Sequence, residues 1–170
     1  VVATITVTPQ TAGPVCVGTP QTFTITVNPA AQINSVSDIT KCKGDSVNAI
    51  VFSTANTIGL TTYSWTNSNP TIGIGASGTG DIPTFTTLNS GTSPSIATII
   101  VTPTFTYNGV SCTGTVEVFT ITVNPVADMI QPVSKVVCNG ETTSVNFATS
   151  NTGTTTYNWS SDIAIGMPAL

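Results

Sequence analysis

Apolar and polar residues alternate with a period of two along short segments of this chain, a pattern typical of β-strands with one buried face. In the clearest segment, Phe119, Ile121 and Val123 alternate with threonines, and we expect all three in the core. Val116 and Val118 fall on the opposite parity. A β-bulge near Val118 would bring both groups to the core, so we expect one there.

A second alternating segment covers residues 61–67 and ends before Asn69 and Pro70. Tyr63 and Trp65 share one face of this predicted strand, because successive side chains point to opposite faces. We therefore expect both residues in the core, with Trp65 filling its middle.

Turn-forming residues divide the neighbouring sequence into further strands. An Asn-Gly pair at 108–109 predicts a hairpin turn, and 76–80 is expected to be a glycine-rich loop. The other predicted strands are 33–40, 46–53, 72–75 (a short edge piece), 82–88, 95–107 and 116–123. About seven strands in a unit of this size predict an all-β, immunoglobulin-like β-sandwich of two antiparallel sheets.

The sequence FTITVNP at 23–29 returns at 119–125, an offset of 119 − 23 = 96 residues. Two cysteine pairs repeat at the same offset: Cys16 with Cys112, and Cys42 with Cys138. Self-similarity at a fixed period indicates a tandem array of one small domain.

We therefore expect repeats of about 96 residues, as the offset 119 − 23 = 96 implies. Residues 1–29 would be the C-terminal part of one repeat, 30–125 a complete repeat, and 126–170 the N-terminal part of the next. On this reading the chain is a segment of a longer protein.

Charged residues make up only 6% of the chain, and the net charge is −4. The chain has three lysines and no arginine or histidine, so nucleic-acid binding and histidine-based catalysis are not expected. The acids are too scattered to suggest a carboxylate pair. No apolar run reaches the length of a membrane span. We expect no enzyme, no cofactor and no metal.

The recurring cysteines suggest disulfides and an extracellular setting. The simplest pairing joins Cys42 to Cys112 within one repeat. In a plain seven-strand sandwich, however, the first turn and the last hairpin lie at opposite ends, and a disulfide needs Cα atoms within about 7 Å. The competing pairing joins the first turn of one repeat to the last hairpin of the next.

Two weaker patterns have simple alternatives. Asp128 lies near a linker and could bind calcium, but its counterpart 96 residues earlier is Gln32, so a solvated residue is the alternative. The sequence Asp45-Ser46-Val47 resembles an acceptor pattern for O-glycans in Bacteroidota and makes Ser46 a candidate glycan site. A simple turn is the alternative there.

The assembled motifs resemble the PKD-like, immunoglobulin-like repeats of giant Bacteroidota surface proteins, of which the SprB-type gliding adhesins are members. The resemblance covers the whole chain, and the residues that carry it are Cys42, Gly44, Tyr63, Trp65, Gly109, Cys112 and 119–125. It implies export by the type IX secretion system and attachment at the outer surface of the cell.

The resemblance implies a repeat segment of a long extracellular adhesin filament, used in attachment and gliding motility. Its expected partners are neighbouring repeats, an extracellular surface or polysaccharide, and the outer-membrane secretion and motility machinery. The alternative function is a carbohydrate-binding or accessory module of a secreted hydrolase. An exposed Trp65 would favour that alternative, whereas we expect Trp65 to be buried.

Overall fold

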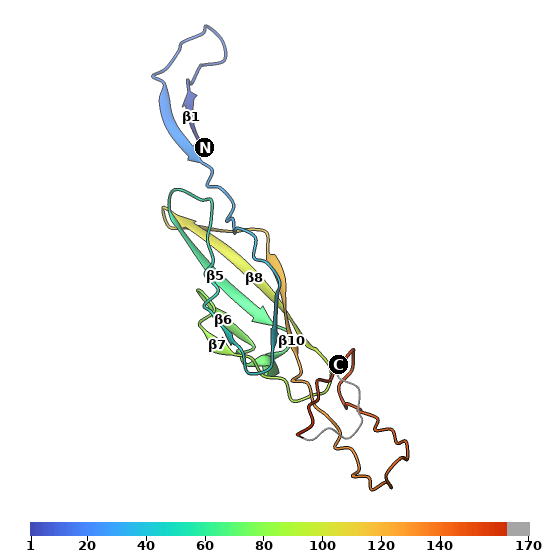
Figure 1. Cartoon of the computed structure of the whole chain (residues 1–170). Helices are drawn as coiled ribbons and strands as arrows, with labels where there is room; N and C mark the ends of the chain where they lie inside the picture. Colours follow the sequence, from blue (N-terminus) through green and yellow to red (C-terminus); the bar gives the residue numbers. More distant parts are fainter. Residues whose placement is uncertain (163–170) are drawn as a thin grey trace.

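The protein is all-β over residues 1–162, the part that the computed structural model describes, and it contains no α-helix there. Three parts follow one another along the chain (Figure 1). A two-stranded hairpin comes first, a body of two sheets covers the middle of the sequence, and a largely irregular segment follows. No helix in the described part is long and apolar enough to cross a membrane.

The larger sheet of the body has the strand order β3-β10-β8-β5-β6, and β9 also pairs with β8. β3 runs parallel to β10, whereas the other neighbours are antiparallel. The strand bounds are β3 Ile39–Cys42, β5 Leu60–Asn67, β6 Ser77–Thr79, β8 Ser95–Tyr107, β9 Val110–Thr113 and β10 Glu117–Asn124.

The smaller sheet pairs β4 (Ser46–Val47) with β7 (Phe85–Thr86), and a bridge between Ile50 and Ile82 extends it. Its apolar side chains belong to the same buried cluster as those of β8 and β10. Two sheets that share one core in this way are consistent with a β-sandwich.

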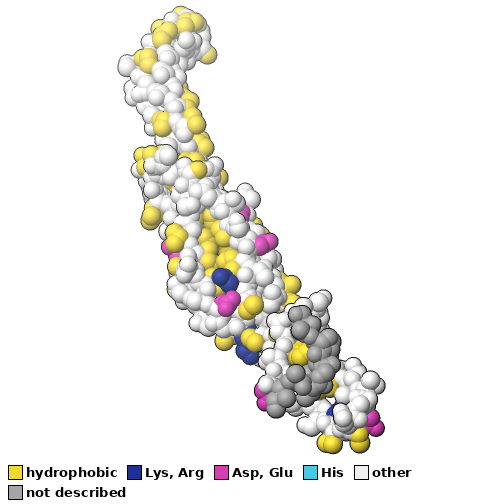
Figure 2. All heavy atoms as spheres, viewed as in Figure 1, with side chains coloured by type: hydrophobic (Ala, Val, Ile, Leu, Met, Phe, Trp, Pro, Cys, Tyr) yellow, Lys and Arg dark blue, Asp and Glu magenta, His cyan; other side chains and the backbone are white. Residues whose placement is uncertain are grey.

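Alternation along β8 and β10 decides what enters this core. On β10, Phe119 is 2% exposed, and Ile121 and Val123 are fully buried. Threonines fill most outward positions, and cross-strand pairs such as Thr98 with Thr120 lie on the solvent side. Figure 2 accordingly shows few charged side chains on the face in view. Each buried Ile, Val or Phe stabilises the fold by about 1.5–3 kcal/mol.

The hairpin turn at Asn108 and Gly109 is confirmed, since it joins β8 to β9 with φ values of 50° and 75°. Positive φ at both central residues is the requirement of the tight turn that Asn-Gly favours. The bulge expected near Val118 is wrong. The extra residue falls between β9 and β10, where Gly114 donates to the Pro103 carbonyl, so Val118 stays 51% exposed.

Several predicted strands are shorter or of another kind. The strands expected at 46–53 and 82–88 contain only β4, β7 and the bridge between them. The edge piece expected at 72–75 instead begins at the end of the 3₁₀ turn Pro70–Ile72 (η1), and the loop expected at 76–80 contains β6.

The strand expected at 33–40 is largely irregular, because only Ile39–Cys42 pairs with β10. Hydrogen bonds to two acidic side chains connect the residues before β3 to β10 instead. Glu117 accepts a hydrogen bond from the Val36 N–H at 2.8 Å, and Asp38 accepts one from the Thr120 N–H at 2.6 Å.

The N-terminal hairpin reproduces part of the body, strand for strand. β1 (Val2–Val7) pairs with β2 (Gln21–Thr26), and Ile5 faces Phe23 as Ile99 faces Phe119. A hydrogen bond also recurs: the Gly18 N–H donates to the Pro9 carbonyl at 2.9 Å, and the Gly114 N–H donates to the Pro103 carbonyl at 3.0 Å. Residues 1–29 therefore have the same local fold as the end of the 30–125 unit.

The segment after β10 reproduces the start of the body. The Cys138 N–H donates to the Glu141 carboxylate at 3.0 Å, as the Cys42 N–H donates to Asp45 at 3.0 Å. The aromatic pairs also correspond: ring centroids are 5.5 Å apart for Phe52 with Tyr63, and 5.6 Å apart for Phe147 with Tyr157.

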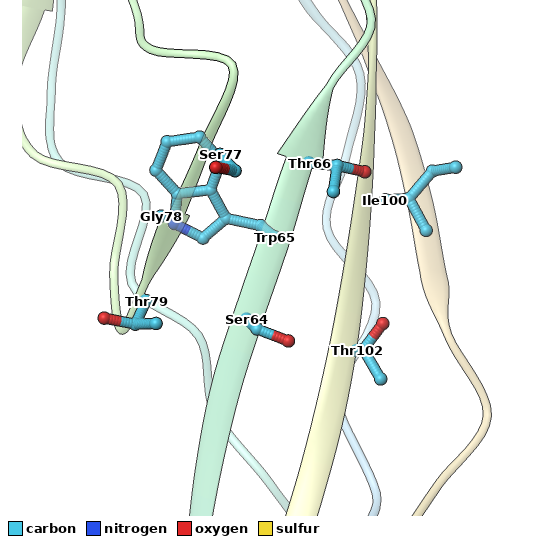
Figure 3. Close-up of a pocket in the computed structure, with 8 residues that line it drawn as sticks. All are labelled: Ser64, Trp65, Thr66, Ser77, Gly78, Thr79, Ile100 and Thr102. Carbon is cyan, nitrogen blue, oxygen red and sulfur yellow. The ribbon is translucent and has the colours of Figure 1, made fainter.

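Trp65 lies in the core at 7% exposure, and its indole packs on the backbone of Gly78 in β6 (Figure 3). A Cβ atom at Gly78 would lie 2.3 Å from the indole atom Cζ2. Glycine at this position therefore permits β6 to pair with β5 over the Trp65 ring. Tyr63 is half-buried and packs against the same core.

We expect Gly78→Ala to lower the free energy of unfolding by about 1–3 kcal/mol, because the added methyl group displaces the Trp65 ring or separates β6 from β5. Urea unfolding followed by far-UV circular dichroism measures the change. Gly75→Ala is the matched control, since its Cβ would meet nothing closer than 3.7 Å. Equal stability of the two variants would contradict this account of Gly78.

Candidate functional site

A shallow depression of about 320 Å³ lies beside Trp65 on the larger sheet. Its lining residues come from β5, β6 and β8 and carry mostly hydroxyl groups: Ser64, Trp65, Thr66, Ser77, Gly78, Thr79, Ile100 and Thr102. Figure 3 shows the Trp65 ring lying over Gly78, on the opposite side of β5 from Ser64 and Thr66. Hydroxyl groups can bind a polar uncharged ligand, but the aromatic residue of the lining, Trp65, is only 7% exposed and offers little ring surface for a sugar to stack on.

The indole Nε1 of Trp65 is buried and has no hydrogen-bond partner among residues 1–162. Trp65 was expected in the core from the alternation, and the structure places it there at 7% exposure. Trp159, its counterpart in the segment after β10, is only half-buried.

The acidic side chains of the 30–125 unit do not converge on a site. Each of them accepts a hydrogen bond from a backbone N–H group of another residue, at 2.6 to 3.0 Å. The four pairs are Asp38 with Thr120, Asp45 with Cys42, Asp81 with Phe52, and Glu117 with Val36. These carboxylates therefore stabilise turns and strand ends, where they satisfy backbone donors.

Asp128, the candidate calcium ligand, also has a carboxylate that accepts hydrogen bonds from neighbouring residues. Its carboxylate accepts hydrogen bonds from the Thr149 hydroxyl at 2.5 Å, from the Ser150 N–H at 3.0 Å and from the Ser150 hydroxyl. The hydrogen bonds from the Ser150 and Thr149 side chains lower the pKa of Asp128. Among residues 1–162, no cluster of three or more acidic, cysteine or histidine side chains could hold a metal ion.

The expected Cys42–Cys112 disulfide is wrong. Both cysteines are free, and the sheet register places them at opposite ends of the body. Cys42 lies opposite Asn124, next to the pair of Val123 with Ser95, whereas Cys112 lies opposite Phe105. The two positions are thus separated by 105 − 95 = 10 residues along β8, which is about 33 Å at the rise of a β-strand.

The 30–125 unit contacts its neighbours in the chain at both ends. At one end, the Asn28 side chain donates to the Tyr107 carbonyl at 3.0 Å, so the β8–β9 hairpin meets the preceding segment. At the other end, the Thr152 N–H donates to the Thr92 carbonyl at 2.9 Å. A disulfide between repeats stays a prediction.

The sequence alone indicates only that Asn28 precedes a strand-ending proline. The signal for its role was its return as Asn124 in the repeated FTITVNP segment. A polar side chain that recurs at the end of a strand is a candidate for a contact between repeats.

Ser46, the candidate O-glycan site, is exposed at the start of β4, where it pairs with Thr86. Its side chain is therefore accessible, and its modification stays a prediction.

A scan against models of known protein families found no match to this chain, and a search of curated proteins found no similar sequence.

We expect peptide mapping of the unreduced protein to find no peptide that links Cys42 to Cys112, because the register holds these residues about 33 Å apart. Alkylation in denaturant, followed by mass spectrometry, should label both thiols of the monomer. The same digest after reduction provides the control for peptide recovery. A linked Cys42–Cys112 peptide in monomeric protein would contradict the register of β8, β9 and β10.

Proposed function

We propose that this chain is a repeat segment of a long extracellular adhesin filament. The observation that carries the proposal is the recurrence of backbone contacts. The same hydrogen bonds and strand pairs occur in 1–29 and in the end of the 30–125 unit, and others recur in 126–162 and in its beginning. Recurrent units joined by short linkers are typical of elongated arrays, in which each unit contacts its neighbours.

We further propose that each complete unit is an immunoglobulin-like, PKD-like sandwich. Support comes from the strand order β3-β10-β8-β5-β6 in one sheet and from the β4–β7 pair that shares its core. The parallel pairing of the first strand with the last strand of the unit agrees with that arrangement.

The terminal strands of the unit suit a filament that carries load. β3 and β10 are parallel, so pulling the two ends of the unit apart loads their four registered pairs in shear. Shear requires several hydrogen bonds to break together. The carboxylates of Asp38 and Glu117 add further bonds between β10 and the segment before β3.

An extracellular position at the cell surface is supported by the low charge of 6%, by the recurring cysteines and by the sequence resemblance described above. Adhesion, gliding motility and export by the type IX system depend on the resemblance alone. Adhesion would be mechanical on this proposal, and no residue is assigned a catalytic role.

The alternative of a carbohydrate-binding module called for an exposed Trp65. Because Trp65 is only 7% exposed and packs on Gly78, no observation favours that alternative.

We expect Asp38→Ala to lower the force that unfolds the 30–125 unit when the chain is held by its two ends. The substitution removes the bond to the Thr120 N–H, which lies beside the sheared strands. Asp81→Ala is the control, because it removes a similar bond, to Phe52, away from β3 and β10. Each change should cost about 1–2 kcal/mol at equilibrium. Equal losses of force in both variants would contradict the mechanical role proposed for β3 and β10.

In cells that produce this protein, an antibody raised against the chain should label the surface without permeabilisation. Protease treatment of intact cells should remove that label. Labelling that depends on permeabilisation would contradict the extracellular location.

A further inference from the structure

The linker at residues 28–32, which joins the N-terminal hairpin to the body, is bound by a side chain of the body. Asn56 donates a hydrogen bond from its side chain to the Ala30 carbonyl at 3.2 Å. The same side chain accepts a hydrogen bond from the Gln32 N–H at 2.8 Å. Ala31 lies between these two bonds and is only 3% exposed. The middle of the linker is therefore packed against the body, although a linker is commonly exposed and mobile.

Two further contacts fix the same linker from its other side. The Ala31 carbonyl oxygen lies so close to Gly114 that a Cβ atom at Gly114 would be 1.9 Å from it. At the start of the linker, the Asn28 side chain donates to the Tyr107 carbonyl at 3.0 Å. The linker is thus held between the loop that carries Asn56 and the strand ends next to β9.

The loop that carries Asn56 lies between β4 and β5 and has the form Thr-x-Asn, at residues 54–56. The Thr54 hydroxyl donates to the Asn56 side chain at 3.0 Å and accepts a hydrogen bond from the Asn56 N–H at 3.1 Å. Local bonds of this kind restrict the conformations of a polar side chain in a loop. The Asn56 amide is therefore already oriented toward the linker.

The Thr-x-Asn loop recurs in the segment after β10. The sequence FSTANT at 52–57 returns as FATSNT at 147–152, an offset of 147 − 52 = 95 residues. There, the Asn151 side chain accepts a hydrogen bond from the Asp128 N–H at 2.8 Å. The Thr149 hydroxyl donates to the Asn151 side chain at 3.1 Å and accepts from the Asn151 N–H at 3.0 Å. The contact between this loop and a linker is therefore a recurring feature of the chain.

The second loop also contacts the unit that precedes it. The Thr152 N–H donates to the Thr92 carbonyl at 2.9 Å. Thr92 belongs to a turn that Asn89 connects to β10, since the Asn89 side chain is 6% exposed and donates to the Val123 carbonyl at 2.7 Å. Val123 lies one residue before the end of β10, where the second linker begins. The loop therefore meets both the linker and the last turn of the preceding unit.

We propose that the Thr-x-Asn loop is a clamp that holds consecutive units of the chain in one orientation. It binds the linker that enters its own unit, and it contacts the turn at the end of the preceding unit. The partner of this surface is the neighbouring unit of the same chain. The proposal rests on the proposed function only in treating the three parts of the chain as consecutive repeats.

The clamp consists of hydrogen bonds and close packing between uncharged groups at the first linker. Contacts of this kind are screened little by salt, whereas contacts between exposed charges weaken. The orientation of the units should therefore be the same at low and at high salt concentration. A filament built in this way is stiff because each linker is bound, rather than because each linker is short.

Nitrogen-15 relaxation of the backbone amides tests the clamp on the 170-residue chain. Rigid backbone has order parameters of about 0.85, and flexible backbone has values below about 0.6. The Ala31 and Gln32 amides should be as rigid as those of β5, and they should fall below about 0.6 in Asn56→Ala. Flexible linker amides in the unmodified chain, or rigid ones in Asn56→Ala, would overturn the proposal.

Asn34→Ala is the matched control for Asn56→Ala. The Asn34 side chain also donates a hydrogen bond, to the Ser53 hydroxyl at 2.8 Å, but that bond lies within the body. The Ala31 and Gln32 amides should therefore stay rigid in Asn34→Ala. An equal loss of order in the two asparagine variants would assign the rigidity to the general stability of the body and would contradict the clamp. Unchanged chemical shifts of the core in each variant confirm that the body is folded.

Residual dipolar couplings test the orientation itself. In the unmodified chain, the amides of β1 and β2 and those of the larger sheet should fit one common alignment tensor, at low and at high salt concentration. In Asn56→Ala the two groups should require separate tensors. A need for separate tensors in the unmodified chain would refute a fixed orientation. That result would leave the proposed function standing, because the surface labelling of cells tests the filament independently of its stiffness.

Discussion

Burial of one face of β8 and β10 against the β4–β7 sheet is the interaction on which the fold of the 30–125 unit depends. The side chains of Ile99, Val101 and Ile121 on that face are fully buried, and threonines occupy most positions on the other face. A slip of one residue in either strand would exchange the two faces and place hydroxyl groups in the core. The bulge between β9 and β10 matters for this reason, since it allows the last strand to continue along β8 with the apolar face still inward.

The few charged residues act within this framework rather than at a site. In the 30–125 unit, each carboxylate accepts a hydrogen bond from a backbone N–H group at a turn or a strand end. Asp38 and Glu117 thereby attach the irregular segment before β3 to β10. Their carboxylates accept hydrogen bonds from the Thr120 and Val36 N–H groups, respectively. An uncharged ligand remains compatible with the hydroxyl-lined depression, but the burial of Trp65 removes the aromatic platform that a sugar would need.

The same core explains the two ends of the chain. Residues 1–29 reproduce local contacts of the end of the 30–125 unit, and residues 126–162 reproduce local contacts of its beginning. Both segments expose apolar residues whose counterparts in the 30–125 unit are buried. Hydrogen bonds between neighbouring strands and within turns therefore form in these segments, although their apolar side chains are not buried. In the 30–125 unit, the contacts found separately in these two segments occur together around one core.

The sequence by itself determined the elements that depend on local chemistry. Alternation predicted β10 and β5, the Asn108-Gly109 pair predicted the hairpin turn, and the 96-residue offset predicted which segments share contacts. The same alternation predicted that Trp65 lies in the core, because successive side chains of a strand point to opposite faces and Trp65 shares its face with Tyr63.

Tertiary structure alone decided what depends on register between distant strands. β6 forms in a glycine-rich segment because Gly78 lets the backbone approach the Trp65 ring, a contact that no local pattern encodes. The bulge lies before Glu117 rather than near Val118 because the pairing of β8 with both β9 and β10 fixes its place. Cys42 and Cys112 are kept apart for the same physical reason: register sets positions along a sheet, and spacing in the sequence does not.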